Sequence, residues 1–193
     1  MRIITGEYRG RRLESPIGYD VRPTSDKVKE AIFNIIMNDI WDATCIDLFA
    51  GTGNLGLEAL SRGAKKCYFG DNSRESIKLI KNNVKMCRAE DKSVIIAGDY
   101  AKTLSRISEK ANVIFLDPPY KDGLYENCLE LIDSHDLLCE DGIIVAEHGV
   151  RDYVPEEVGN LEIIKERKYG KIMVTIYAAK KDAVMQEDES DEQ

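Results

Sequence analysis

The stretch VIFLDPPY, residues 113–120, ends an apolar run with an acid, two consecutive prolines and an aromatic ring. The Asp117 carboxylate and the Pro118 carbonyl can accept hydrogen bonds from the two N–H groups of an exocyclic amine, because Pro119 restricts residue 118 and helps to direct that carbonyl. Tyr120 offers a face for base stacking, worth about 1–3 kcal/mol in single-stranded nucleic-acid sites. Unless the motif is an ordinary turn after a strand, it predicts a site that grips the NH₂ group of a base.

A glycine-rich motif lies upstream of this stretch. Gly51-x-Gly53-x-x-Gly56 falls between a predicted strand and a predicted helix, and Asp71 lies twenty residues beyond Gly51. The glycines permit a tight turn and close approach of a ligand to the backbone, and the acid can accept both ribose hydroxyls. The motif therefore predicts an adenosine-containing cofactor but does not say which one.

Four acids fall at or next to the carboxyl ends of successive predicted strands: Asp47, Asp71, Asp99 and Asp117. Ligands bind at that edge of open α/β sheets. Each acid alone is more often a turn former or a helix cap, but four together would line one crevice with negative charge. Such a lining opposes a pyrophosphate and suits S-adenosylmethionine (SAM), which carries a sulfonium cation and an amino group. We therefore expect SAM as the cofactor.

The elements that must position these residues follow an alternating pattern, as in a parallel sheet between helices. We expect strands at Cys45–Phe49, Lys66–Gly70, Ser93–Ala97, Val113–Leu116 and Ile143–Ala146, and helices at Leu55–Arg62, Ser73–Cys87, Tyr100–Ser108 and Tyr125–His135. Two further strands without an intervening helix flank residues 169–170. The pattern predicts the α/β, Rossmann-like fold of class I SAM-dependent methyltransferases, a mostly parallel seven-stranded sheet with an antiparallel C-terminal hairpin.

The domain organisation follows from length and charge. A chain of 193 residues with 43% hydrophobic content suits one globular domain, assigned to residues 24–181 and preceded by a small β-hairpin at residues 1–23. The domain is expected to begin with a helix from about residue 25 to 38. The net charge is −8, but residues 182–193 hold six acids and form a tail that we expect to be disordered. The first twelve residues carry four arginines, which form either a nucleic-acid contact or a solvated hairpin: Arg2, Arg9, Arg11 and Arg12.

Cysteine usage and hydropathy limit the remaining classes. The five cysteines are scattered without a C-x-x-C pair and only two histidines accompany them, so we expect reduced thiols and no metal site. The N-terminus lacks the apolar stretch of a signal peptide, and no run approaches the roughly 18 apolar residues of a membrane span. We expect a cytoplasmic protein with no membrane partner. His148 is interpreted as a structural loop histidine.

The chain as a whole resembles the RsmD-type bacterial methyltransferases, which use SAM to methylate N2 of a guanine in small-subunit (16S) ribosomal RNA. The similarity is carried by MRIITGEYRGRRL, RPTSDKVKEAIFNII, DLFAGTGNLGLEALSRGA, FLDPPY, GIIVAEH and KYGKIMVTIY. The glycine turn and the Asp-Pro-Pro-Tyr motif are shared with many SAM enzymes. The N-terminal segment and the RPTSDKVKEAIFN block are more specific to this family.

The resemblance implies a role for individual positions. The methionine side of the SAM pocket would be shaped by Asp47, Ala50, Gly51, Thr52 and Gly53. Asp71 would hold the ribose, and Asp99 with the backbone of Tyr100 would meet the adenine. The target amine would be held by Asp117, Pro118, Pro119 and Tyr120. The RNA contacts would come from Arg2, Arg9, Arg11 and Arg12, with Arg22 and Thr24 beside the catalytic pocket.

The partner implied by the resemblance is 16S rRNA or a small ribosomal subunit particle, bound by a monomer. Two alternatives remain open from the residues. Adenine N6 in DNA or RNA presents the same kind of amine to the same motif, although the small chain leaves little room for a DNA-reading domain. A non-catalytic ribosome assembly factor could also retain the SAM fold.

Overall fold

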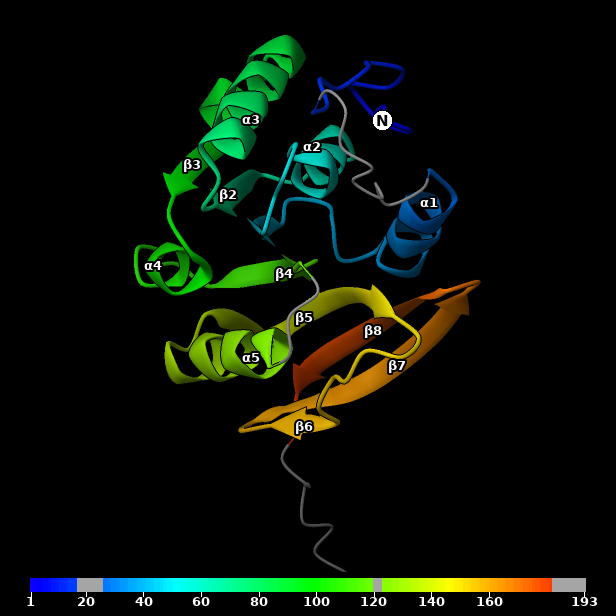
Figure 1. Ribbon diagram of the computed structural model, residues 1–193, viewed down its shortest axis with the longest axis vertical. Helices are drawn as coiled ribbons and strands as arrows, with labels where there is room; N and C mark the ends of the chain where they lie inside the picture. The colour runs from blue at the N-terminus through cyan, green and yellow to red at the C-terminus, as the bar shows by residue number, and fades with distance from the viewer. Residues whose placement is uncertain (17–25, 120–122, 182–193) are drawn as a thin grey trace, which may run out of the picture.

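Eight strands form one sheet in the order β3-β2-β1-β4-β5-β8-β7-β6 in a computed structural model, which describes residues 1–16, 26–119 and 123–181 (Figure 1). The strands are β1 Thr44–Leu48, β2 Lys66–Asp71, β3 Ser93–Ala97, β4 Ala111–Leu116, β5 Leu138–Gly149, β6 Glu157–Val158, β7 Leu161–Tyr169 and β8 Ile172–Ala179. Strands β1 to β5 pair in parallel, whereas β8, β7 and β6 add antiparallel strands beyond β5. The order reverses at β1 and β4, which is where such sheets bind ligands.

Helices cover both faces of the sheet (Figure 1). The helices are α1 Asp26–Ile35, α2 Asn54–Ser61, α3 Arg74–Cys87, α4 Tyr100–Leu104 and α5 Leu124–Ser134, with a 3₁₀ turn at Glu90–Lys92. The first three contribute apolar side chains to one core, and α4 and α5 contribute to the other. Because both faces are covered, successive residues of β1 such as Cys45 and Ile46 are buried in opposite cores, and the strand reads as a continuous apolar run.

Local sequence signals account for the helix that follows β2. The Ser73 side chain accepts a hydrogen bond from the Ser76 N–H group at 3.3 Å and caps α3. Ile80 and Val84 lie four residues apart on the buried face of that helix. Lys81 and Asn82 between them are exposed, whereas Asn83 is buried and makes hydrogen bonds through its side chain. The amphipathic pattern therefore orients α3 on the sheet.

The expected methyltransferase architecture is confirmed, including the parallel strands and the antiparallel C-terminal hairpin. The sheet differs from the seven-stranded expectation by the two-residue strand β6, which pairs with the beginning of β7. Strand β5 is also longer than its apolar core Ile143–Ala146. Within the described ranges, no helix has the length and apolar character needed to cross a membrane.

The N-terminal segment, residues 1–14, is not the regular β-hairpin that the sequence predicts. One isolated antiparallel bridge joins Arg2 to Arg12, and turns at Gly6 and Gly10, both with positive φ, occupy the space between. Part of its backbone bonds to side chains of α2 instead of to a partner strand. The predicted contacts Arg22, Thr24 and Tyr120, and the acidic tail at 182–193, lie outside the described residues.

Candidate active site

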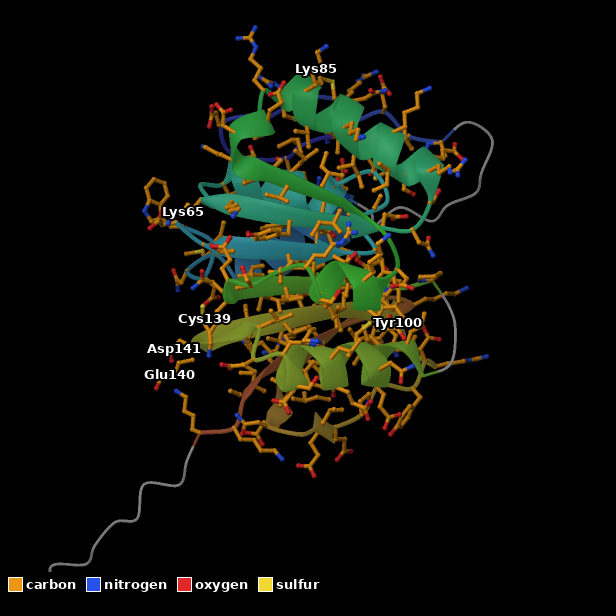
Figure 2. The ribbon with its side chains drawn as sticks, turned by 90° about the vertical axis from the view of Figure 1, so that its left-hand side faces the viewer. Lys65, Lys85, Tyr100, Cys139, Glu140 and Asp141 are labelled. Carbon is orange, nitrogen blue, oxygen red and sulfur yellow. The ribbon has the colours of Figure 1, made fainter. Side chains whose placement is uncertain are left out.

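A cleft of about 630 Å³ opens at the carboxyl ends of the central strands. It brings together most of the residues that the sequence singled out for cofactor and substrate: Asp47, Ala50, Gly51, Thr52, Asp71, Asp99, Tyr100, Asp117, Pro118 and Pro119. Figure 2 shows Tyr100 on the side of the molecule opposite Lys65 and Cys139, which lie near the amino ends of β2 and β5. The predicted glycine turn and the Asp-Pro-Pro motif therefore share one cavity.

The glycine turn after β1 needs unusual backbone geometry. Phe49, Gly51 and Gly53 have φ values of 68°, 57° and 79°, so the chain reverses through the left-handed region before α2 begins. Gly53 does not line the cleft; it occupies the position before the first residue of α2. A Cβ atom on Gly56 would lie 2.3 Å from Phe69 Cε1, so the third glycine allows α2 to pack directly against β2.

Asp71, at the end of β2, is held by two backbone groups. Its Oδ2 accepts a hydrogen bond from the Gly51 N–H group at 2.9 Å, and its Oδ1 accepts one from the Ser73 N–H group at 2.8 Å. These bonds fix the carboxylate beside the glycine turn and leave each oxygen with further acceptor capacity. Asp71 therefore offers hydrogen-bond acceptors to the cleft that it lines.

Asp47 is a buried carboxyl group beneath the glycine turn. Its side chain accepts a hydrogen bond from the Gly56 N–H group at 2.8 Å, in the first turn of α2. Burial raises the pKa of Asp47 to about 7, opposed by the Gly56 hydrogen bond and reinforced by the charge of Asp71. A cation bound in the cleft would favour the ionised form of this group, whereas a phosphate would oppose it.

Asp117 follows β4 and faces the cleft, where its side chain is open to solvent. The protein encloses its remaining surroundings, and this desolvation raises the pKa of Asp117 well above the usual range. The nearby charges of Glu147 and Asp47 raise that pKa further. Because water still reaches Asp117 from the cleft, the full desolvation applies only when a bound molecule fills that space.

Glu147 is a cleft residue that the sequence reasoning missed. It is buried on β5, lines the cleft and contributes to the raised pKa of Asp117. The signal was available, because Glu147 lies toward the carboxyl end of the fifth parallel strand in GIIVAEH. Like the four predicted aspartates, this glutamate is an acid near the carboxyl end of a parallel strand.

His148, expected in a structural loop, lies instead within β5 and lines the cleft. Its Nε2 is 2.8 Å from Thr175 Oγ1, and its Nδ1 is 3.0 Å from the Gly149 carbonyl oxygen. The Tyr125 ring meets the imidazole edge-on, with ring centroids 5.8 Å apart. Both ring nitrogens are thus engaged by the protein, which agrees with a structural role but not with the predicted loop.

The beginning of α4 forms another part of the cleft wall. The Asp99 side chain accepts a hydrogen bond from the Lys102 N–H group at 2.8 Å and caps this helix. The rings of Tyr100 and Phe49 lie 6.0 Å apart at an angle of 36°. An adenine ring could bind beside this aromatic pair, with Asp99 at the edge of the site.

The four predicted RNA-contact arginines differ in their surroundings. Arg2 forms an exposed ion pair with Asp26, and Arg11 donates a hydrogen bond to the Met86 carbonyl oxygen at 2.7 Å. Arg9 and Arg12 are exposed, and their guanidinium groups have no partner among the described residues. These two arginines are the ones most available to a phosphate backbone.

SAM fits the residues of this cleft better than a pyrophosphate does, because the buried Asp47 and the neighbouring Asp71 and Asp117 offer negative charge to a cation. Among the described residues, no group of three histidine, cysteine, aspartate or glutamate side chains is arranged to hold a metal ion. The fold and the cleft together define a class I, SAM-dependent methyltransferase architecture.

Comparison with known proteins defines the family. Residues 1–178 match the family described as "Conserved hypothetical protein 95". The chain is 41% identical over 180 residues to "Putative rRNA methyltransferase YlbH" of Bacillus subtilis, covering 92% of this chain and 98% of that protein. It is 33% identical to "Ribosomal RNA small subunit methyltransferase D" of Escherichia coli K12, covering 92% of this chain and 89% of that protein.

A solved structure described as "Putative methyltransferase yhhF from Escherichia coli" superposes with a TM-score of 0.84 at 31% identity, covering 93% of this chain and 97% of that one. Similarity therefore extends over nearly all of both chains, including the N-terminal segment. The chain belongs to the RsmD-type rRNA methyltransferase family.

Proposed function

We propose that this protein is a SAM-dependent methyltransferase that modifies the exocyclic N2 amine of a guanine in small-subunit rRNA. The observation that carries the proposal is the single cleft shared by the Asp117-Pro118 segment and the Asp47–Asp71 cofactor side. Family membership supports rRNA as the substrate class. The choice of guanine N2 over adenine N6 rests on the resemblance in the N-terminal segment and the RPTSDKVKEAIFN block.

The chain would bind the cofactor through groups at or just beyond the carboxyl ends of β1, β2 and β3. Asp47 would face the cationic end of SAM, Asp71 would accept the ribose hydroxyls, and Asp99 with Tyr100 would border the adenine. When bound, SAM supplies an electrophilic methyl group on a sulfonium sulfur. Asp117 and Pro118 would accept the two N–H groups of the target amine and direct its nitrogen lone pair at that methyl carbon.

The methyl transfer forms an N–C bond while the C–S bond breaks, and the bonding electron pair stays on sulfur. The amine nitrogen then carries an extra positive charge and loses one proton. Asp117 would accept that proton in its ionised form, and the raised pKa makes the ionised carboxylate a stronger base than an ordinary one. Orientation supplies the larger share of the rate, since well-aligned reactants gain roughly 7–11 kcal/mol of barrier reduction.

Substitutions of Asp117 and Asp71 test whether the first residue binds the target amine and the second binds the cofactor. We expect Asp117→Ala to lower methyl transfer by at least about 10²-fold while the SAM Kd changes little, because the acid orients the amine. We expect Asp71→Ala to weaken SAM binding by about tenfold through the lost ribose contacts. Calorimetry gives the SAM Kd, and equal losses of SAM affinity in both variants would contradict the assignment.

The substrate is tested with radiolabelled SAM, small ribosomal particles and rRNA from cells that lack the enzyme, followed by nucleoside mass spectrometry. N2-methylguanosine is the expected product. N6-methyladenosine would move the acceptor to an adenine methyltransferase. Measured SAM binding without incorporation into either substrate would favour a ribosome assembly factor that retains the SAM fold.

A further inference from the structure

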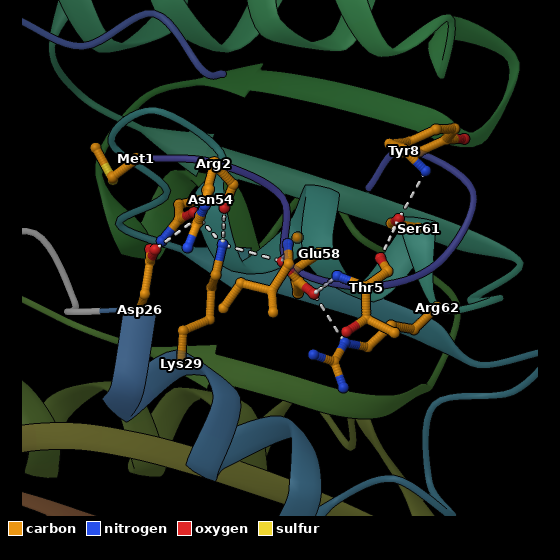
Figure 3. Close-up of polar contacts among 12 residues, drawn as sticks. Met1, Arg2, Thr5, Tyr8, Asp26, Lys29, Asn54, Glu58, Ser61 and Arg62 are labelled. Atoms are coloured by element: carbon orange, nitrogen blue, oxygen red, sulfur yellow. Dashed lines mark hydrogen bonds and ion pairs between the residues drawn. The ribbon is translucent and has the colours of Figure 1, made fainter. Parts of the chain in front are cut away.

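A buried ion-pair network lies between the N-terminal segment, α1 and α2 (Figure 3). The Lys29 side chain is 1% exposed, and its Nζ lies 3.0 Å from Oε2 of Glu58, whose side chain is fully buried. Arg62 Nε lies 2.8 Å from Glu58 Oε1. Charges are costly to bury unless their hydrogen bonds are satisfied. The RPTSDKVKEAIFN block contains Lys29, which does not line the cleft, so the proposed chemistry leaves this residue unexplained.

One side of the network holds the backbone of the N-terminal segment. The Glu58 carboxylate accepts hydrogen bonds from the N–H groups of Ile4 at 2.8 Å and Thr5 at 3.1 Å. Lys29 Nζ donates a hydrogen bond to the Arg2 carbonyl oxygen at 2.6 Å (Figure 3). These bonds add to the few backbone hydrogen bonds within the segment, such as Ile3 N–H to the Arg11 carbonyl oxygen at 3.0 Å, and they hold the segment against α1 and α2.

The other side of the network reaches the glycine turn between β1 and α2, residues 49–53, which we call the cofactor turn. Lys29 Nζ also donates a hydrogen bond to Asn54 Oδ1 at 2.8 Å, and Asn54 is both the first residue of α2 and a residue of the cleft wall. A parallel link passes through Asn83, whose side chain amide donates to the Thr52 carbonyl oxygen at 2.9 Å and whose Oδ1 accepts from the Glu14 N–H group at 2.7 Å. Met1, at the beginning of the segment, lines the same cleft.

We infer that Lys29 is a positioning residue that sets the N-terminal segment and the cofactor turn in one fixed arrangement. An ammonium group has three donors, and Lys29 directs one at the Arg2 carbonyl oxygen of the N-terminal segment and the other two at Asn54 and Glu58 of α2. An apolar side chain of the same size would leave all three acceptors short of a donor. The inference rests on the proposed function for the RNA-contact role of the N-terminal segment.

The test compares Lys29→Met with Ile32→Val. Ile32 is fully buried on the same helix, and its loss of one methyl group lowers Tm by about 2–4 °C without removing a polar contact. We expect Lys29→Met to raise both the SAM Kd and the KM for small ribosomal particles by about tenfold, because both sides of the site lose a hydrogen bond to a cation. The kcat at saturating substrates should stay within about threefold of wild type, since none of the Lys29 contacts involves Asp117.

Asn54→Ala distinguishes the contact of Lys29 with the cofactor turn from its contact with the N-terminal segment. It removes the link to the cofactor turn and leaves the Lys29 bond to the Arg2 carbonyl oxygen, so we expect a higher SAM Kd with an unchanged KM for the particle. If Lys29→Met folds and lowers Tm but leaves the SAM Kd and the particle KM as in Ile32→Val, the inference is overturned. If Lys29→Met does not fold, Asn54→Ala decides: an unchanged SAM Kd overturns the inference.

The results expected if the proposed function is wrong differ from those that would overturn the inference about Lys29. Wild-type protein would then bind SAM and methylate neither rRNA nor particles. The SAM Kd values of Lys29→Met, Asn54→Ala and Ile32→Val would still decide whether Lys29 positions the cofactor turn.

Discussion

At the scale of single residues, Asp47 is a buried carboxyl group whose ionisation links stability to pH. It is buried at the end of β1, and burial raises its pKa from 3.8 to about 7. The folded state therefore binds more protons than the unfolded state between these values. The stability contributed by protonated Asp47 is fully present below pH 4 and is lost as the pH rises through 7.

We expect Asp47→Asn to remove this loss, because an amide of the same shape can still accept the Gly56 hydrogen bond. Between pH 5 and pH 8, the free energy of unfolding of wild type should fall relative to the variant by at most about 3 kcal/mol, because about two pH units lie between pH 5 and the raised pKa and each contributes about 1.4 kcal/mol. Urea denaturation at several pH values gives the comparison. Asp141→Asn, at an exposed acid, serves as the control and should follow wild type; identical pH profiles for all three proteins would refute the role of Asp47.

At the scale of elements, the contact between α2 and β2 places the cofactor turn. Gly56 allows this close packing, because a Cβ atom there would lie 2.3 Å from Phe69 Cε1 and 2.6 Å from Cys67 Sγ. Both neighbours are fully buried in the core and have little room to move. The position of α2 in turn fixes the Gly56 N–H group that holds Asp47.

We expect Gly56→Ala to destabilise the fold by about 1–3 kcal/mol through overpacking and to weaken SAM binding as α2 moves away from β2. Gly98→Ala is the matched control for stability; Gly98 itself lines the cleft, so it is not a control for SAM binding. The three heavy atoms nearest to a Cβ atom at Gly98 all belong to the Lys102 side chain, with Cδ at 2.6 Å, and that flexible chain can move aside. Thermal denaturation checks both variants and SAM calorimetry checks Gly56→Ala; equal stability losses would argue against the α2–β2 contact as the cause.

At the scale of the whole molecule, charge is distributed unevenly along the chain. The net charge of −8 includes six acids within residues 182–193, whereas the first twelve residues hold four arginines and one acid. The N-terminal segment packs against α2 beside the cleft, and Met1 belongs to the cleft wall. The beginning of the basic segment therefore borders the cleft, in keeping with its proposed contact with RNA.

We expect Arg9→Glu combined with Arg12→Glu to lower RNA affinity and to reduce the dependence of log Kd on log salt by about 1.5, since each lost phosphate contact removes about 0.7–0.9. The SAM Kd should not change. Arg106→Glu, at an exposed arginine after α4, is the charge-matched control for one substitution. Filter binding at several salt concentrations measures the slope, and an unaltered slope in the double variant would count against the segment as an RNA surface.

The local signals of the sequence determined the cofactor turn, the acids after the strands, the Asp-Pro-Pro motif and the parallel order of elements. Each of these depends on residues close in sequence: a glycine turn, a strand that ends in an acid, and a helical or strand period of apolar residues. Their meeting in one cleft follows from the topology of a parallel sheet, which brings the carboxyl ends of its strands to the same edge.

Only the tertiary structure decided how the N-terminal segment is held and which charges interact. The segment reads as a hairpin because its residues alternate, yet Glu58 takes the N–H groups of Ile4 and Thr5, more than fifty residues away in sequence. The raised pKa of Asp117 likewise depends on Glu147, which a different strand supplies. Burial and long-range pairing set these energies, and neither has a period or a spacing that a single sequence reveals.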